Sequence, residues 1–209
     1  MRITGIEKAK GRSYKIFVDG EYWYILHAEL VVDHKLKEGL SVTEEQLEEI
    51  RYEADYRKAR ERALYLLEYR DHSRKELIDK LLRSVNNLHI AEEIADKMEE
   101  YGFLDDERYA KKLARDFLER KRLGKRRAGF EMMKKGVSRD LAQQVLEEYE
   151  IDPQEQLVSL LERKYARYLG DEKGRRKVVN ALLRLGHPYD EIKQALQQFE
   201  DQQEYDEEF

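Results

Sequence analysis

A helical segment that recurs three times at near-equal spacing constrains the fold of this chain more than any other feature. The segment opens at residues 74–78 and recurs at residues 125–129 and 175–179, so the offsets are 51 and 50 residues. In each copy, apolar pairs stand four positions apart, which places one apolar stripe along a helix. Gly136 matches Gly186 beyond the second and third copies, and glycine is a common helix stop. Such internal repetition predicts a tandem-repeat protein.

Each copy is flanked by two further helical patterns. The preceding helices are predicted over residues 52–69, 107–122 and 154–169, and the following ones over residues 90–101, 138–149 and 189–199. The unit is therefore three helices in about fifty residues. Chance similarity between amphipathic helices is the alternative, but it does not readily explain the matched glycines and offsets. Because charged residues are as frequent as hydrophobic ones, at 41% each, we expect an elongated, curved arrangement of small units.

The first forty residues have the pattern of a small antiparallel sheet. Asp19-Gly20 is a strong two-residue hairpin signal, because a type I′ turn needs positive φ at both positions. A short helix is expected over residues 28–37, ending at Gly39, and Thr43 with Gln46 predicts a capping box that starts a long helix. Runs rich in β-branched and aromatic residues predict three strands, over residues 3–9, 13–18 and 21–27.

These patterns divide the chain into five predicted segments. The first is a sheet extension with its short helix, the next three are the helical repeats, and the last is an acidic tail expected to be disordered. Their predicted bounds are residues 1–40, 41–104, 105–151, 152–200 and 201–209.

Several classes of chemistry lack candidate residues. There is no cysteine, and none of the five histidines stands four residues from another on a helix, so we predict no metal site. There is no glycine-rich phosphate loop and no Gly-x-Ser-x-Gly turn, so we predict no cofactor, no catalytic residues and no enzymatic activity. The first residues lack the apolar core of a signal peptide, and no window approaches ~20 apolar residues. We therefore expect a cytoplasmic protein, not bound to membranes and monomeric.

Charge is distributed unevenly along the chain. The net charge is −5, yet residues 107–139 hold thirteen Lys and Arg against four Asp and Glu, and the last ten residues hold six acids and no base. A chain with this distribution can bind a polyanion locally while repelling it globally.

The predicted starts of the middle helices carry unusual charges. Ser73 with Glu76 forms an ordinary capping box, but the equivalents of Ser73 are Gly124 and Gly174, each followed by three cations. Cations in the first helical turn are unfavourable by roughly 0.3–1 kcal/mol each. One interpretation is a docking point for phosphate or acidic side chains on the free backbone N–H groups. The other is that the predicted boundaries are off by a turn and the charges lie in a solvated loop.

Phe130 stands where the other repeats carry polar residues, Asp79 and Asn180, which should face water. An aromatic ring within a basic surface could stack on a base or fill a pocket of a partner, whereas packing against a neighbouring repeat is the alternative. The candidate residues for binding a partner or DNA are Arg115, Arg120, Lys121, Arg122, Lys125, Arg126, Arg127, Phe130, Lys134, Arg175, Arg176 and Lys177.

Several motifs, taken in order, resemble those of the RecX regulatory proteins. Residues 70–82 resemble the signature of that family's first repeat, residues 101–110 its Gly-aromatic-Leu-Asp-Asp segment, and residues 135–138 its Lys-Gly-Ile-Ser turn. The resemblance covers residues 52–199. His187-Pro188 replaces the turn in the third repeat, which is a modest departure.

The resemblance implies three three-helix repeats and a regulatory role. RecX proteins bind the RecA recombinase filament, bind single- or double-stranded DNA to some degree, and in general restrain strand exchange, ATP hydrolysis and co-protease action in DNA repair and the SOS response. Three other functions remain open: a helical protein that binds DNA without RecA, a protein–protein adaptor whose basic face is merely solvated, and a hydrolase or nuclease. The last would need a metal or nucleophile that the sequence does not supply.

Overall fold

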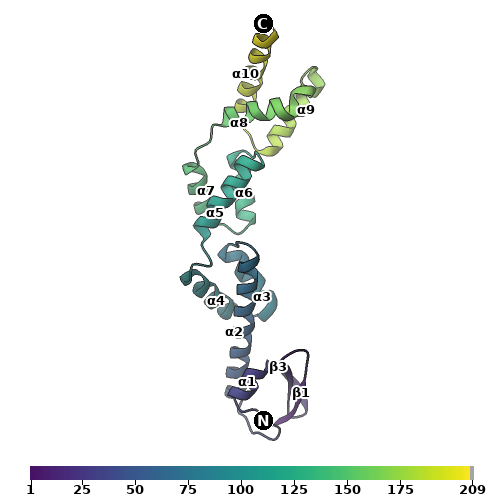
Figure 1. The fold of residues 1–209 in the computed structure, drawn as a ribbon, viewed down its shortest axis with the longest axis vertical. Coiled ribbons are helices and arrows are strands. Elements are labelled where there is room, and N and C mark those ends of the chain that lie inside the picture. Colours follow the sequence, from purple (N-terminus) through teal and green to yellow (C-terminus); the bar gives the residue numbers. More distant parts are fainter. Residues whose placement is uncertain (208–209) are drawn as a thin grey trace. The chain divides into compact units, whose positions relative to one another are not determined.

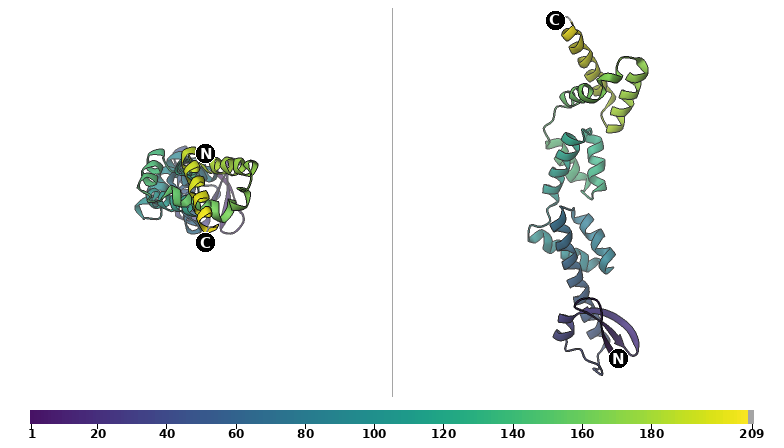
Figure 2. Two further views of the ribbon diagram at one scale, coloured as in Figure 1. Left: turned by 90° about the horizontal axis from the view of Figure 1, so that it is seen from above. Right: turned by 45° about the vertical axis from the view of Figure 1, so that its right-hand side comes forward.

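The fold consists mainly of helices, preceded by one small sheet (Figure 1). The structure is a computed structural model. It describes residues 1–207, and it describes their side chains as far as Gln203. Contacts divide the chain into two compact units. Unit 1 comprises residues 1–71 and 77–104, and unit 2 comprises residues 72–76 and the chain from residue 105 onward. Figure 2 shows the sheet of unit 1 lying beside α1 (Ala28–Asp33) and the start of α2 (Glu44–Tyr69).

The sheet has three antiparallel strands in the order β1-β2-β3. The strands are β1 (Ile3–Lys8), β2 (Ser13–Val18) and β3 (Glu21–His27), within one residue of the predicted bounds. Asp19 and Gly20 adopt φ values of 50° and 89° between β2 and β3, as the hairpin signal predicts. Ile3, Ile16 and Leu26 are fully buried on the inner face. The sheet is thus held by a core of its own rather than by hydrogen bonds alone.

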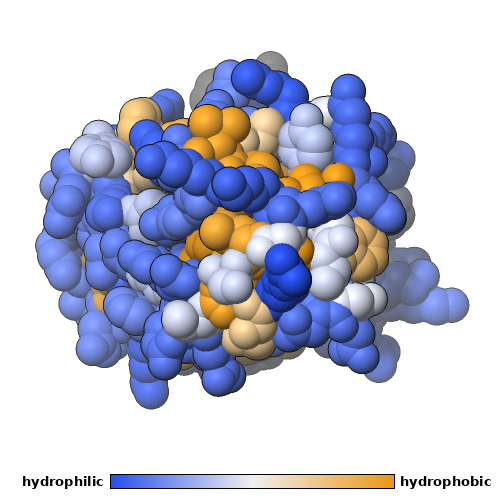
Figure 3. Space-filling model, turned by 90° about the horizontal axis from the view of Figure 1, so that it is seen from below, coloured by the Kyte–Doolittle hydropathy of each residue, from blue (hydrophilic) through white to orange (hydrophobic). Residues whose placement is uncertain are grey.

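The outer surface of unit 1 remains partly apolar. Tyr22 and Ile25 of β3 are 57% and 45% exposed. Figure 3 views the molecule from below, toward the end of unit 1 that carries the sheet. Apolar side chains gather near the middle of this face, and hydrophilic ones surround them.

The short helix α1 (Ala28–Asp33) ends before the predicted Lys37. Lys35 adopts a φ of 50°, and its N–H donates to the carbonyl of Val32 at 2.9 Å, which turns the chain early. The next helix, α2 (Glu44–Tyr69), begins at the predicted capping box, where Thr43 Oγ1 accepts from Gln46 N at 3.2 Å.

Helix α2 joins two hydrophobic cores. Its first half supplies Leu47 and Ile50 to the core beneath the sheet, and its second half supplies Ala59 and Ala63 to the first repeat. The core of the sheet therefore reaches beyond the predicted segment boundary at residue 40. The sheet, marginal by itself, gains its second layer from this helix.

Each repeat contains the three predicted helices. The first repeat uses α2, α3 (Arg74–Val85) and α4 (Leu88–Glu100). The second uses α5 (Asp106–Arg115), a π-helical turn (Asp116–Arg120), α6 (Lys125–Lys134) and α7 (Arg139–Glu148). The third uses α8 (Pro153–Leu160), a π-helical turn (Leu161–Tyr165), a 3-10 turn (Ala166–Tyr168), α9 (Glu172–Leu185) and α10 (Tyr189–Glu207).

Equivalent residues fill the three repeat cores. Leu81, Met132 and Leu182 are fully buried at the same position of the three middle helices. Burying one such side chain contributes roughly 1.5–3 kcal/mol, so each repeat is held mainly by its own cluster. The apolar stripe predicted from the repeat therefore faces a core in all three copies.

The end of the chain differs from the predicted disordered tail. Helix α10 continues to Glu207, so residues 201–207 are helical, and residues 208–209 lie outside the described residues. Glutamate and glutamine are good helix formers, and no glycine or proline interrupts this stretch. The helix that packs on the third core therefore extends past Phe199, which is the last buried residue among the side chains described through Gln203.

Candidate interaction surface

The first turn of α6 carries three cations, as predicted. Gly124 is the N-cap residue, and because it has no side chain it supplies no capping oxygen. Lys125, Arg126 and Arg127 follow as the first three helical residues. This turn therefore combines positive side chains with the positive end of the helix dipole.

The carboxyl end of α9 docks on that turn. Gly186 ends α9 in a left-handed conformation with a φ of 91°, and Gly124 N donates to Leu185 O at 2.9 Å. A Cβ atom on Gly124 would lie 2.3 Å from Gly186 O, so only glycine fits there. The last carbonyls of α9 carry partial negative charge, and they offset the cations at the start of α6. The joint thus satisfies the N–H of Gly124 with a backbone carbonyl, so this group needs no bound anion.

The same joint recurs one repeat earlier within unit 2. Gly136 follows α6 with a φ of 89°, and a Cβ atom there would lie 2.3 Å from Ser73 Oγ. Ser73 Oγ donates to Lys135 O at 2.7 Å and accepts from Glu76 N at 3.1 Å. The predicted Ser73 cap is thus present and also binds the following repeat. Asn86, at the equivalent place after α3, is exposed and reaches a φ of 48° without needing glycine.

In the third repeat, the predicted helix start at Gly174 is wrong. Helix α9 begins at Glu172, and Asp171 is its N-cap, with Asp171 Oδ1 accepting from Gly174 N at 2.5 Å. Arg175, Arg176 and Lys177 consequently lie beyond the first turn. The third repeat has the acidic cap that a stable helix favours, and its cations are not placed at free backbone N–H groups.

A groove of about 540 Å³ opens between α6 and α7 in the second repeat. Gly129 permits the two helices to approach, because a Cβ atom there would lie 3.2 Å from Leu146 Cδ1. The lining combines three exposed cations, Lys125, Arg126 and Arg139, with apolar side chains that include Met133. The remaining lining residues are Gly129, Phe130, Ala142, Gln143, Leu146 and Glu147. With three cations and one carboxylate, the lining favours an acidic occupant with an apolar part.

Phe130 lies at this groove and is 48% exposed, as its position on the helix predicts. Lys134 Nζ stands 4.5 Å from the ring centroid, and Arg127 Cζ stands 5.7 Å from it. Cations at these distances are attracted to the ring face. The ring is therefore a partly covered apolar contact surrounded by positive charge.

Acidic side chains neutralise much of the rest of the predicted basic surface. Asp116, Glu119 and Glu131 each accept from cations on or near their own helical turn. The nitrogen–oxygen distances are 3.3 Å for Arg115–Glu119, 2.9 Å for Arg120–Asp116, 3.3 Å for Lys121–Asp116, 2.7 Å for Arg127–Glu131 and 3.4 Å for Lys134–Glu131. Exposed pairs of this kind contribute only about 0–1 kcal/mol, so a partner can displace them.

Arg122 belongs to the joint rather than to the groove. Its backbone is left-handed, with a φ of 53°, and its carbonyl lies 3.0 Å from His187 Nε2. His187 is 3% exposed, and burial lowers the pKa of its imidazole. The neutral ring therefore donates its Nε2 proton to Arg122 O, which holds the turn before α6 against the turn after α9.

The predicted cations of the third repeat do not reach the groove. Arg175 Nη1 pairs with Glu200 Oε1 at 2.6 Å, and Arg176 Nε lies 3.7 Å from Glu172 Oε1. Lys177 is exposed on α9, away from the residues that line the groove. Among the described residues, the structure therefore gathers Lys125, Arg126 and Phe130 at one site and leaves the third-repeat cations on a separate face.

Sequence reasoning missed seven of the ten residues that line the groove, and two of the seven had a signal. Met133 belongs to the apolar pair of the second repeat, and Arg139 directly follows the predicted cap Ser138. Ala142 and Leu146 had none, because they are core residues of α7 and their place at the groove depends on how closely α7 approaches α6. In the part of the chain that is described, no three His, Asp or Glu side chains are grouped to hold a metal ion, and no helix is long and apolar enough to cross a membrane.

Three models of one family match successive parts of the chain. They describe the first, second and third three-helix domains of RecX, and they match residues 59–84, 105–146 and 150–196. The chain belongs to the RecX family. Each match lies on one of the three helical repeats, and the first ends before α4.

Curated relatives and solved structures agree with this placement in the RecX family. The "Regulatory protein RecX" of Clostridioides difficile (strain 630) is 29% identical and covers 98% of both chains, and that of Clostridium tetani is 28% identical and covers 93% of both. A crystal structure of RecX from Lactobacillus salivarius is 28% identical over 70% of this chain and 97% of its own, with a TM-score of 0.63. A second crystal structure, of regulatory protein RecX, is 22% identical over 92% of this chain and 98% of its own, with a TM-score of 0.61. This likeness shows the fold alone.

Proposed function

We propose that this chain is a cytoplasmic, monomeric regulator that binds RecA and the RecA–DNA filament. It inhibits the recombinase, ATPase and co-protease activities of the filament in DNA repair and the SOS response. The family gives the regulatory class, and the groove between α6 and α7 supplies the contact. The observation that carries the proposal is a groove lined by both cations and apolar side chains in the second repeat of a RecX chain.

The chemistry of the groove suits the surfaces that such a filament presents. Lys125, Arg126 and Arg139 can pair with acidic side chains of RecA or with DNA phosphates. Phe130 and Met133 can receive an apolar side chain, and methionine adapts its shape to different partners. A ligand that uses both features would be held in position as well as attracted.

Repetition supports binding to a polymer. Within unit 2, the end of α9 meets the start of α6 at Gly186, and the end of α6 meets residues 73–76 at Gly136. A filament likewise presents one equivalent surface for each protomer. Several weak contacts with successive protomers add to a tight overall attachment, because each contact after the first is intramolecular. Occupying the filament in this way would exclude a second duplex or a cleavage substrate.

A second candidate is a helical protein that binds DNA without RecA, and the cation-rich surface of residues 107–139 favours it. The two functions differ in their dependence on the recombinase. If phosphates are the target, affinity must fall with salt at a slope set by the number of contacts. A regulator of the filament contacts RecA as well as DNA, so it should bind a RecA–DNA filament more tightly than the same DNA alone.

Co-sedimentation separates the two functions. The full chain would be mixed with RecA filaments on single-stranded DNA and, in parallel, with the same DNA alone at physiological salt. The regulator is expected in the pellet with filaments and in the supernatant with bare DNA. Equal retention on both would overturn the proposal in favour of the RecA-independent function, and no retention on filaments would reject it outright.

A further inference from the structure

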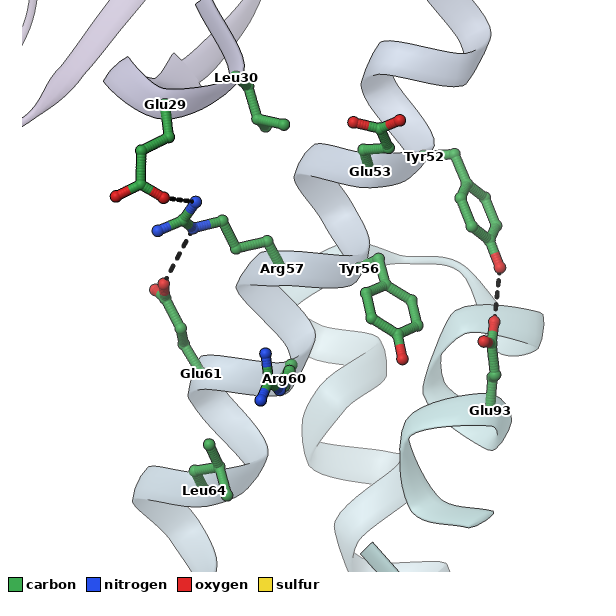
Figure 4. A pocket seen from close by; sticks show the side chains of 10 residues that line it. All are labelled: Glu29, Leu30, Tyr52, Glu53, Tyr56, Arg57, Arg60, Glu61, Leu64 and Glu93. Atoms are coloured by element: carbon green, nitrogen blue, oxygen red, sulfur yellow. Dashed lines mark hydrogen bonds and ion pairs between the residues drawn. The ribbon is translucent and has the colours of Figure 1, made fainter. Parts of the chain in front are cut away.

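A second groove, of about 730 Å³, runs along α2 in unit 1 (Figure 4). Helix α1 bounds it on one side through Glu29 and Leu30, and α4 bounds it on the other through Glu93. Residues of α2 form its floor: Tyr52, Glu53, Tyr56, Arg57, Arg60, Glu61 and Leu64. The groove is separate from the α6–α7 groove, and the inference drawn from it does not rest on the proposed function.

The floor follows one stripe of α2. Tyr52, Tyr56, Arg60 and Leu64 stand four residues apart, so they line a single helical face about 18 Å long. The rings of Tyr52 and Tyr56 stack with centroids 6.4 Å apart, and Leu64 is 38% exposed. Three of these four positions are aromatic or apolar, and an opposing helix can match the one-turn spacing of the stripe.

The walls of the groove are acidic. Arg57 donates to both Glu29 and Glu61, so one guanidinium is shared between two carboxylates (Figure 4). On the opposite wall, Glu93 accepts from the hydroxyl of Tyr52 at 2.6 Å. The whole lining holds four glutamates against two arginines. This excess of negative charge favours a cationic occupant.

The aromatic floor also accepts cations. Lys97 Nζ of α4 already lies 4.8 Å from the ring centroid of Tyr56, and it pairs with Glu93 at 3.2 Å. A carboxylate beside a tyrosine ring therefore holds an ammonium group at the edge of this groove. The same carboxylate, Glu93, also accepts from the hydroxyl of Tyr52, and Glu53, whose carboxylate lies 2.8 Å from His34 Nε2, adds a further negative charge to the lining.

We propose that the groove along α2 docks a cationic helical segment of a partner protein, about three turns long, which carries Arg or Lys beside a large apolar residue. Its cations pair with Glu53, Glu61 and Glu93, and its apolar residue lies against Tyr52, Tyr56 or Leu64. Nucleic acid does not suit this surface, because the carboxylates would repel its phosphates.

A pair of synthetic peptides tests the assignment with the full chain. The probe is a fluorescein-labelled peptide of about twelve residues, with arginines and leucines on one helical face and alanine elsewhere. Its counterpart carries glutamate in place of each arginine. Fluorescence anisotropy should show saturable binding of the arginine peptide and much weaker binding of the glutamate peptide. Equal binding of the two would show that apolar contact alone drives association and would overturn the proposal.

Two double variants test whether the peptide binds in this groove. Glu53→Gln with Glu93→Gln should weaken binding of the arginine peptide by roughly three- to tenfold, the effect expected of two exposed ion pairs. The matched control is Glu68→Gln with Glu100→Gln, which removes the same charge from exposed positions of the same two helices. The control should bind as the parent does. An equal loss in both would mean that net charge, not the groove, attracts the peptide.

A gain of affinity provides a test that misfolding cannot imitate. Arg60 is exposed at the groove and forms no ion pair with any described residue. Arg60→Glu should strengthen binding of the arginine peptide severalfold, and unchanged or weaker binding would contradict the assignment.

Sedimentation of the protein without peptide tests the remaining possible occupant of the groove, which is a second copy of the chain. Self-association that disappears in the Glu53→Gln, Glu93→Gln variant would mean that a second copy fills the groove, and the proposal would then be wrong.

Discussion

Gly186 and Arg127 approach so closely that a Cβ atom on Gly186 would stand 2.3 Å from the Cβ of Arg127. The third repeat thereby places the end of its middle helix on the start of the middle helix before it. Gly136 makes the equivalent approach to Ser73. At the start of α9, a residue of the same repeat occupies the position where another helix would dock. A Cβ atom on Gly174 would lie 1.8 Å from Tyr168 O. The series of joints therefore ends at the third repeat.

The joint makes Gly186 sensitive to a single methyl group. Gly186→Ala should lower the free energy of unfolding by about 2–4 kcal/mol, since it combines left-handed backbone strain with overpacking. Urea denaturation followed by circular dichroism measures the change. Gly170→Ala, in the same repeat, is the control, because Gly170 has no neighbour within 4 Å and no positive φ. A loss at Gly186 no larger than that at Gly170 would show that the joint does not form.

The observed start of α9 predicts a role for Asp171. Asp171→Ala removes the oxygen that caps Gly174 N and should lower the free energy of unfolding by about 1 kcal/mol. Asp171→Asn should be close to neutral, because asparagine caps nearly as well. Thermal unfolding of the three proteins distinguishes these outcomes. If alanine and asparagine behave alike, the helix starts elsewhere, as the sequence suggested.

The start of α9 illustrates which parts of the fold can be predicted from the sequence and which cannot. The repeat, the strands and the caps at Thr43 and Ser73 were predicted because each depends on residues close together in the chain. The joint was not predicted, because Gly124 and Gly186 meet only after two repeats have folded. The matched glycines were noticed as helix stops. Their second role, the close approach of another helix, has no local signature in the sequence.

Burial of His187 predicts a dependence of stability on pH. Desolvation lowers the pKa of the folded imidazole below its ordinary 6.5, and hydrogen bonding to Arg122 O and the charge of Glu191 oppose that shift. The unfolded chain therefore binds more protons as the pH falls below about 6.5, so the free energy of unfolding decreases there and is fully retained above it. Urea titrations at pH 7.5 and pH 5.5 should show this loss. His187→Gln should reduce it, and an unchanged loss in the variant would assign it to other groups.

Exposure of Phe130 predicts a loss of binding without a loss of stability. Phe130→Ala should change the free energy of unfolding by less than about 0.5 kcal/mol, because the ring is half exposed. Its affinity for RecA filaments should fall at least severalfold, as for an aromatic contact in an interface. Tyr189→Ala removes another ring, 58% exposed, outside the groove and should leave binding unchanged. Equal affinities of the two variants would remove Phe130 from the contact.

The candidate site was predicted only in part, for a physical reason. The count of cations in residues 107–139 pointed to the second repeat, but it did not show which of them are paired. Asp116 and Glu131 lie one turn from cations that they neutralise, a spacing that the sequence contains but that a count of charges does not use. Arg139 joins the site because α7 folds back on α6, which a linear count of charge cannot show.

The rate of DNA-dependent ATP hydrolysis by RecA, measured with this protein added at substoichiometric amounts, tests the central claim most directly. The parent chain should slow hydrolysis, and the Lys125→Glu, Arg126→Glu, Arg139→Glu variant should slow it much less while keeping its helical content. Arg163→Glu, Lys173→Glu and Lys193→Glu, which change the same charge at exposed positions outside the groove, should leave inhibition intact. A parent chain that leaves hydrolysis unchanged even in excess would contradict the account.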